Sequence, residues 1–225
     1  MMSEPISPTS GWGVLHLFCK PTAVLDREAV VAAAKSLRES DHQLVAASML
    51  GHKCDVAFMV LGPDLRVLRR FQSALAAAGL QIVDSYVSLT EVSEYAKGLP
   101  AEMVQSRLYP QLPPPDKPAF CFYPMSKRRA PGANWFTLPY EQRLALMHDH
   151  GKSGRTFAGR ITQLITGSAG FDDFEWGVTL FGVHPDDVKD VVYTMRFDEA
   201  SAIYAEFGPF YVGYVVDVDE LAALL

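Results

Sequence analysis

The side chains that could carry chemistry are concentrated in the second half of the chain. Residues 123–129 place three consecutive cations, Lys127, Arg128 and Arg129, just after an expected strand. Such a run is most often a solvated basic loop, but ammonium and guanidinium groups also bind carboxylates through charge-assisted hydrogen bonds. The segment therefore indicates either a surface loop or a site for an anionic ligand. Tyr123 alone is more often a structural tyrosine of a sheet than a catalyst.

Two histidines, His148 and His150, lie near the end of a helix expected over 139–150. The apolar arc of this helix is formed by Tyr140, Leu144 and Met147. The two histidines fall on opposite sides of that arc, so periodicity does not choose between them, and each could be a surface histidine. His150 precedes Gly151 at the helix end, where its ring could reach into a cavity. No second metal ligand lies at zinc spacing, whereas a porphyrin iron needs only one imidazole because the macrocycle supplies four nitrogens.

Gln163, on an expected strand, and residues 195–201 (MRFDEAS) are further candidates. The chain has no G-x-G-x-x-G, P-loop or G-x-S-x-G motif, so nucleotide binding and serine hydrolysis have no local support.

Composition limits the class of protein. The 225 residues are 49% hydrophobic and 20% charged, which is typical of a globular protein, and the net charge of -6 argues against a general nucleic-acid binder. Three separated cysteines, Cys19, Cys54 and Cys121, are expected to be buried free thiols in a reducing compartment. Residues 1–10 lack the pattern of a secretory signal, and no apolar run is long enough to span a bilayer, so we expect a cytoplasmic protein.

The elements that must position these residues follow the same order twice. In the first half we expect a strand at 12–18, a helix at 26–39, strands on both sides of 51–53, a helix from 63 to 79 and a strand at 80–89. In the second half we expect strands at 119–123, 157–166, 174–183 and 209–216, with helices at 139–150 and from 185. Both halves read as β-α-β-β-α-β, so the sequence predicts an α+β fold of two tandem ferredoxin-like units with antiparallel sheets. The expected boundaries are 1–96 for an N-terminal structural domain, 97–118 for a proline-rich linker and 119–225 for a C-terminal domain.

These segments, in this order, resemble the coproheme decarboxylases of the chlorite dismutase family. The matching stretches are FCFYPMSKRR at 120–129, NWF at 134–136, HG at 150–151, GR at 154–155, ITGS at 165–168, FEWGVTLF at 174–181, MRFDEAS at 195–201 and FGPFYVG at 207–213. The match covers the second half; the first half agrees mainly in its order of elements and in residues 93–95. The resemblance implies the dimeric α+β barrel fold of that family, with haem bound by the C-terminal domain alone, and a homopentamer.

The resemblance also implies residue roles. His150 matches the iron ligand, Tyr123 the tyrosine that becomes a radical, and Lys127 the lysine beside the reacting propionates. Substrate-binding positions are Arg107, Tyr109, Met125, Gln163, Arg196 and Ser201, of which Arg107 and Tyr109 are placed less firmly because the linker length varies. Gln163 matches the residue over the open iron face, where chlorite dismutases proper carry an arginine.

The expected reaction is the peroxide-dependent decarboxylation of two propionates of Fe-coproporphyrin III (coproheme), which yields haem b. Coproheme then serves as both substrate and cofactor, and a transient contact with coproporphyrin ferrochelatase is an expected partnership. The alternatives are a haem-dependent chlorite dismutase or peroxidase, and a non-catalytic haem carrier. A carrier would need His150 but would have no use for Tyr123 and Lys127 together.

Overall fold

A computed structural model describes residues 4–225; of the segment 1–10, residues 1–3 lie outside this range. The first half forms the predicted β-α-β-β-α-β unit. Its elements are β1 (Gly13–Pro21), α1 (Arg27–Arg38), β2 (Gln43–Met49), β3 (Val56–Gly62), α2 (Leu65–Ala77) and β4 (Leu80–Thr90). Both helices begin at an aspartate whose carboxylate accepts a backbone N–H of the first turn: Asp26 from Ala29 at 3.0 Å and Asp64 from Arg66 at 2.9 Å.

The second half repeats this order, which confirms the predicted fold class. Its main elements are β5 (Ala119–Lys127), α4 (Tyr140–Arg155), β8 (Ile161–Gly167), β9 (Trp176–Gly182), α5 (Pro185–Met195) and β11 (Tyr211–Val216). Shorter elements are β6 (Arg129–Ala130), β7 (Ala133–Asn134), η1 (Trp135–Thr137), α6 (Glu199–Ala202), β10 (Ala205–Phe207), η2 (Val218–Glu220) and α7 (Leu221–Leu224). Two predicted limits were too short. The strand from 119 continues to Lys127, and α4 continues past His150 to Arg155.

The proline-rich segment 97–118 contains a helix that the sequence did not predict. Helix α3 (Ala101–Leu108) begins directly after Pro100, where a proline is compatible with a helix start. None of its side chains is fully buried, so its sequence carries little of the apolar periodicity by which helices are recognised.

Nine strands from both units join in one closed sheet, while β6 and β7 form a separate pair. Across residues 4–225 the order is β10-β5-β11-β2-β3-β1-β4-β8-β9, and β9 also pairs with β5, which closes the ring. The two units meet where β11 pairs with β2 and where β4 pairs with β8, both antiparallel. Inside the ring, side chains from both units form a shared core, among them Phe18, Met59, Phe122, Leu164 and Phe181. The faces that lack helices therefore cover each other.

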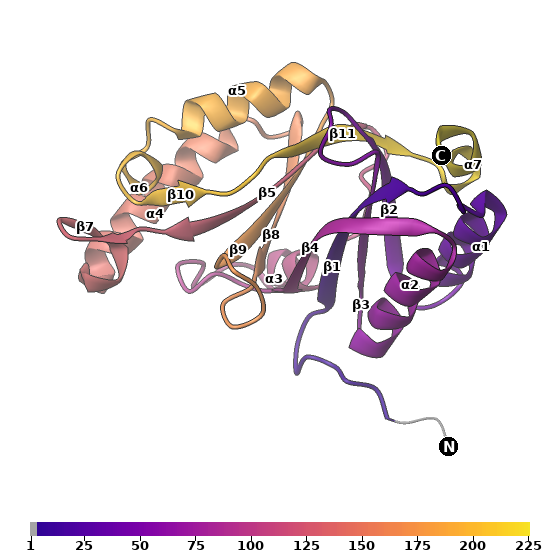
Figure 1. Ribbon diagram of the computed structural model, residues 1–225. Coiled ribbons are helices and arrows are strands. Elements are labelled where there is room, and N and C mark those ends of the chain that lie inside the picture. The colour runs from indigo at the N-terminus through magenta and orange to yellow at the C-terminus, as the bar shows by residue number, and fades with distance from the viewer. Residues whose placement is uncertain (1–3) are drawn as a thin grey trace.

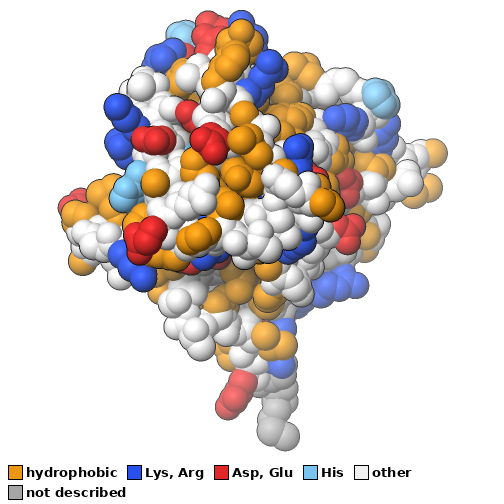
Figure 2. All heavy atoms as spheres, turned by 90° about the vertical axis from the view of Figure 1, so that its left-hand side faces the viewer, with side chains coloured by type: hydrophobic (Ala, Val, Ile, Leu, Met, Phe, Trp, Pro, Cys, Tyr) orange, Lys and Arg blue, Asp and Glu red, His pale blue; other side chains and the backbone are white. Residues whose placement is uncertain are grey.

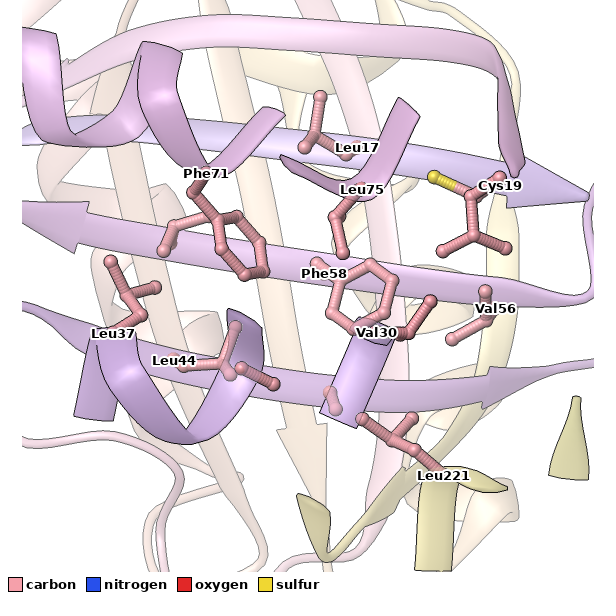
Figure 3. Packing of buried hydrophobic residues seen from close by; sticks show 14 of the residues in the cluster. Leu17, Cys19, Val30, Leu37, Leu44, Val56, Phe58, Phe71, Leu75 and Leu221 are labelled. Carbon is pink, nitrogen blue, oxygen red and sulfur yellow. The ribbon is translucent and has the colours of Figure 1, made fainter. Parts of the chain in front are cut away.

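The outer face of the first unit is closed. Helices α1 and α2 lie on one side of the sheet, opposite α4 and α5 (Figure 1). Between them and the strands, Phe58 packs edge-on against Phe71 at 5.7 Å, surrounded by aliphatic side chains such as Val30, Leu75 and Leu221 (Figure 3). Burial of these apolar side chains is the main stabilisation of this unit.

Two further expectations concern burial and membranes. Cys19, Cys54 and Cys121 are buried and unpaired, as predicted. Within residues 4–225, no helix combines the length and the apolar character that crossing a bilayer requires.

Candidate functional site

The outer face of the second unit carries the strongest candidates. Tyr123, Met125 and Lys127 are alternate residues of β5, so their side chains lie on one face of the sheet. This face is the one that packs against α5, because Tyr123 and Met125 contact the apolar cluster formed with Val188 and Val191 of that helix. Lys127 is the last residue of the strand and does not belong to a loop after it.

The strand register places Gln163 on the same face. Tyr123 is opposite Val178 of β9, which is opposite Ile165 of β8; Cys121, Leu180 and Gln163 form the neighbouring row. Directly opposite residues of antiparallel strands share a face. Ile165 is 42% exposed and Gln163 is exposed, although both lie on the face that carries helices. The helices therefore leave the β8 side of this face open.

Tyr123 is held by two phenylalanines. Its ring stacks on Phe210 with centroids 4.5 Å apart and meets Phe207 edge-on at 5.7 Å, and only 7% of the residue is exposed. The backbone at Gly208, between these phenylalanines, lies close to two side chains. A Cβ there would be 2.6 Å from Pro124 and 2.7 Å from Phe174, so the position favours glycine. Burial raises the pKa of the Tyr123 phenol above its ordinary value.

Lys127 is a buried cation with defined partners. Its ammonium group donates to the carbonyl oxygen of Ala200 at 2.6 Å and lies 4.3 Å from the centre of the Trp135 ring. The carboxylate of Glu175 accepts the Lys127 backbone N–H at 2.8 Å. Burial lowers the pKa of Lys127 to about 8, while the Glu175 carboxylate acts in the opposite direction. At neutral pH this lysine therefore carries a charge that it can give up more readily than a surface lysine.

The two arginines that follow behave as a solvated surface pair. Arg128 lies 3.6 Å from Glu206, and Arg129 is exposed and pairs with Glu175. Of the three cations, only Lys127 lies inside, so the surface-loop interpretation applies to the arginines, and the anion-site interpretation stays a prediction for the lysine.

His150 faces a carboxylate, whereas His148 is exposed. The Nδ1 atom of His150 lies 3.3 Å from Oδ2 of Asp198 and 3.5 Å from Oγ of Ser201. Oδ2 is buried and lacks a well-aligned hydrogen bond, while Oδ1 accepts one from Ser153 at 2.7 Å. Burial and then the Lys127 charge lower the pKa of His150, and Asp198 opposes them. With its proton on Nδ1 toward Asp198, the neutral ring leaves Nε2 free as a metal ligand.

The remaining candidates are only partly brought together. Ser201 lies at His150, and Arg196 is exposed at the end of α5, with its guanidinium 5.0 Å from the centre of the Tyr193 ring. Tyr109 is used elsewhere: its hydroxyl accepts the Gly11 N–H at 3.2 Å and its ring lies edge-on to Trp12. Within the described range, no hydrogen bond or ion pair connects Arg107 or Tyr109 with His150, Tyr123 or Lys127.

Three residues at the site were missed by reasoning from the sequence: Asp198, Glu175 and Trp135. Each lies inside a stretch that carried the family resemblance, but no spacing rule connects Asp198 with His150 or Glu175 with Lys127. Asp198 follows His150 by 48 residues, and Glu175 follows Lys127 by the same number, so only the fold brings each pair together.

The arrangement suits an anionic ligand that an imidazole can hold from one side. His150 on α4 and Gln163 on β8 come from the helix layer and the sheet layer respectively, and Lys127 supplies a buried positive charge. Seen from the side of α4 and α6, apolar side chains form a band across the middle of the molecule, with charged side chains on both sides (Figure 2). Within residues 4–225, no three His, Cys, Asp or Glu side chains converge as a metal-ion cage.

Comparison with known proteins gives consistent results. A family model described as Chlorite dismutase matches residues 23–216. The chain is 42% identical to a coproheme decarboxylase of Staphylococcus carnosus, with 98% of each chain covered. It is 40% identical to a putative heme-binding protein of Natronomonas pharaonis, over 98% of this chain but only 42% of that longer protein.

Solved structures show the same likeness. A heme-binding protein of Thermus thermophilus has a TM-score of 0.85 at 36% identity, with 98% of both chains covered. Chlorite dismutase of Candidatus Nitrospira defluvii, solved in complex with imidazole, has a TM-score of 0.76 at 19% identity, with 96% and 95% covered, which shows a shared fold. The family model spans most of the chain, and two relatives exceed 35% identity over nearly all of it. This chain therefore belongs to the chlorite dismutase family.

Proposed function

We propose that this protein is a coproheme decarboxylase, which uses hydrogen peroxide to convert two propionates of Fe-coproporphyrin III into vinyl groups and releases haem b. The observation that carries the proposal is the pairing of two features on the outer face of the second unit, between His150 of α4 and Gln163 of β8, which we call the slot. Nδ1 of His150 lies 3.3 Å from the carboxylate of Asp198, and Tyr123 and Lys127 lie four residues apart on the same face of β5. A site that only carried haem would need the first feature but not the second.

Binding of the substrate would use the helix side and the sheet side of the slot. Nε2 of His150 would hold the iron, and Met125, Ile165 and Gln163 would contact the porphyrin. Lys127, Arg196 and Ser201 provide positive charge and hydrogen bonds for propionates. Local cations are needed because coproporphyrin brings four carboxylates to a chain whose net charge is -6. The less firmly placed Arg107 and Tyr109 would have to move from their present contacts to take part.

The chemistry divides between substrate and protein. The bound iron porphyrin supplies the oxidising power of peroxide. Each propionate loses CO₂, one proton and two electrons as the vinyl group forms, and each peroxide accepts two electrons and is reduced to water. Tyr123 passes on an electron and its phenol proton, and the resulting radical takes a hydrogen atom from the propionate side chain. The second electron would pass from the substrate radical to the oxidant formed from peroxide as CO₂ departs. Lys127 orients the carboxylate and, with its lowered pKa, can exchange a proton at Nζ near neutral pH.

The surroundings of Tyr123 fit this role. A buried phenol with a raised pKa stays protonated, so electron and proton must leave together, and the stacked Phe210 ring restricts the ring's motion. A structural tyrosine in a sheet would not need Lys127 on the same face.

A mass spectrum of the porphyrin provides the test. Purified protein loaded with ferric coproheme and given peroxide in steps should release two carboxyl groups in sequence. Unchanged porphyrin mass would reject the proposal, and oxygen release from chlorite would instead support a chlorite dismutase. The proposal also includes a domain division: a structural N-terminal domain over 1–96, a linker over 97–118 and a haem-binding domain over 119–225. We further propose that the protein is a cytoplasmic homopentamer and that it makes transient contact with coproporphyrin ferrochelatase.

A further inference from the structure

A cavity lies on the side of β5 opposite to Tyr123 and Lys127. Its volume is about 160 Å³. Since a water molecule occupies about 30 Å³ of liquid, the cavity has room for a group of several non-hydrogen atoms. Five aromatic side chains form much of its wall: Phe18, Tyr86, Phe122, Phe174 and Tyr211.

Three carboxylates, those of Asp84, Asp172 and Asp173, also line the cavity, and among the residues of the described chain no Lys or Arg lines it. Asp84 accepts the Tyr211 hydroxyl and, at 2.8 Å, the Ser85 N–H. Asp172 accepts the Val87 N–H at 2.8 Å and the Asp173 N–H at 2.9 Å. Neutral donors thus fix the carboxylates of Asp84 and Asp172. Within residues 4–225, none of the three aspartates forms a salt bridge.

The aromatic wall already attracts a cation from within the chain. The ammonium group of Lys53 lies 5.4 Å from the centre of the Tyr211 ring and donates to the Phe210 carbonyl, so it approaches the cavity wall without lining the cavity. Burial raises the pKa of Tyr86 to about 12; its hydrogen bond with Ser168 opposes this shift, and the charges of Asp172 and Glu175 add to it.

We propose that this cavity binds an organic cation, an alkylammonium or alkylguanidinium group, against the aromatic rings and between the carboxylates of Asp84 and Asp172. Ring faces attract such cations, and carboxylates add charge-assisted hydrogen bonds. A bare metal ion fits less well, because calcium and magnesium require six or more oxygen ligands and most of this wall is carbon. The cation could be a free amine or a Lys or Arg side chain from a second copy of the chain.

The position of the cavity connects it to Tyr123. Phe122 and Pro124 line it while Tyr123, between them, points to the opposite face; Pro209 and Tyr211 line it while Phe210, between them, stacks on Tyr123. A cation bound here would therefore rest on the reverse side of both segments that hold Tyr123.

Calorimetric titration of the porphyrin-free protein tests the proposal. n-Butylammonium and n-butylguanidinium should bind, whereas n-butanol and butyrate, which have the same chain but no positive charge, should not. Affinity should fall as NaCl is raised, since the acids at the mouth are partly exposed. The double substitution Asp84→Asn with Asp172→Asn should weaken binding by about tenfold or more, and Phe174→Leu by a smaller factor. Glu39→Gln, which removes one exposed charge outside the cavity, should leave binding unchanged.

The two sources of the cation give different results. If wild-type protein takes up neither free cation, sedimentation velocity should show a smaller assembly for the Asn double variant than for wild type, as expected when a neighbouring copy fills the cavity. Equal binding of butanol and butylammonium, or no binding together with an unchanged assembly, overturns the proposal. Should the double variant unfold, the four probes and the salt series on wild-type protein decide alone. Because no porphyrin is present, failure here leaves the proposed decarboxylation untouched.

Discussion

The two β-α-β-β-α-β units have the same order of elements but differ in how completely the helices cover the sheet. In the first unit, α1 and α2 close over an apolar core that includes Phe58 and Phe71. In the second, α5 covers only part of the sheet, and α4 has no fully buried side chain. Gln163 and Ile165, on the sheet face that carries the helices, remain exposed, and His150 is only partly buried.

The difference shows how one architecture yields a core or a site. Where apolar residues fill both layers, the helices dock fully and the unit gains stability. Where the helix layer contributes His150 and the strand contributes Lys127, burial requires polar partners, and the helices leave part of the sheet face uncovered. The first unit should therefore govern stability and the second should govern ligand binding, and substitutions can separate these roles.

The largest expected effect on stability comes from Phe58→Ala in the closed unit. Removing this buried ring should lower the free energy of unfolding by about 3–5 kcal/mol, because it leaves a cavity among packed side chains. Ile165→Ala, on the open face of the second unit, should change it by less than about 1 kcal/mol yet weaken coproheme binding. Denaturant titration monitored by circular dichroism measures both. Similar losses for the two variants would contradict the contrast between units.

The largest effect on ligand binding should follow His150→Ala. Loss of the iron ligand should weaken ferric coproheme binding by more than about 100-fold, beyond what removing a residue behind a ligand usually costs. Absorbance titration of the Soret band measures it. His148→Ala, two positions along the same helix and exposed, is the matched control and should bind like wild type. If His148→Ala weakened binding and His150→Ala did not, His148 would be the iron ligand.

Tyr123→Phe should separate binding from reaction. The ring and its stacking on Phe210 remain, so coproheme should bind normally, while turnover with peroxide should fall by at least about 100-fold because the phenol proton is gone. Rapid-mixing absorbance and porphyrin mass give the rate. Retained turnover would remove Tyr123 from the mechanism.

Asp198→Asn should have an intermediate effect through His150. Replacing the carboxylate at Nδ1 should weaken coproheme binding by about 10–100-fold. It should also lower the frequency of the iron–histidine stretch in resonance Raman spectra of the ferrous complex, since the ring becomes less basic. An unchanged frequency would mean that Asp198 serves only Ser153 and the helix.

The smallest predicted effect is a pH dependence due to Lys127. Below its pKa of about 8 the lysine is charged and attracts propionate. Bound carboxylates raise that pKa, so the dissociation constant should begin to rise as pH passes through about 8 and should increase by about tenfold in total. Lys127→Met should bind more weakly at pH 7 and show no such rise. A wild-type curve that stays flat from pH 7 to 9 would exclude a charged role for this lysine.

Much of the fold could be read from the sequence, because strongly periodic segments such as 65–77 and the alternating strands determine their own type. The pairing of β4 with β8 and of β11 with β2 could not, since a period of two residues identifies a face but not a neighbouring strand. Helix α3 was missed because its residues bury little. At the site, helical periodicity could not decide whether His148 or His150 is the metal ligand. The family resemblance favoured His150, and in the structure the carboxylate of Asp198 lies beside its ring.

A structure of the protein with ferric coproheme bound tests the central claim most directly. The account predicts Nε2 of His150 on the iron, the porphyrin plane between α4 and the β8 side of the sheet, and the Tyr123 hydroxyl beside a propionate that Lys127 contacts. Iron bound by any other residue, or a porphyrin whose propionates all point away from β5, would contradict it.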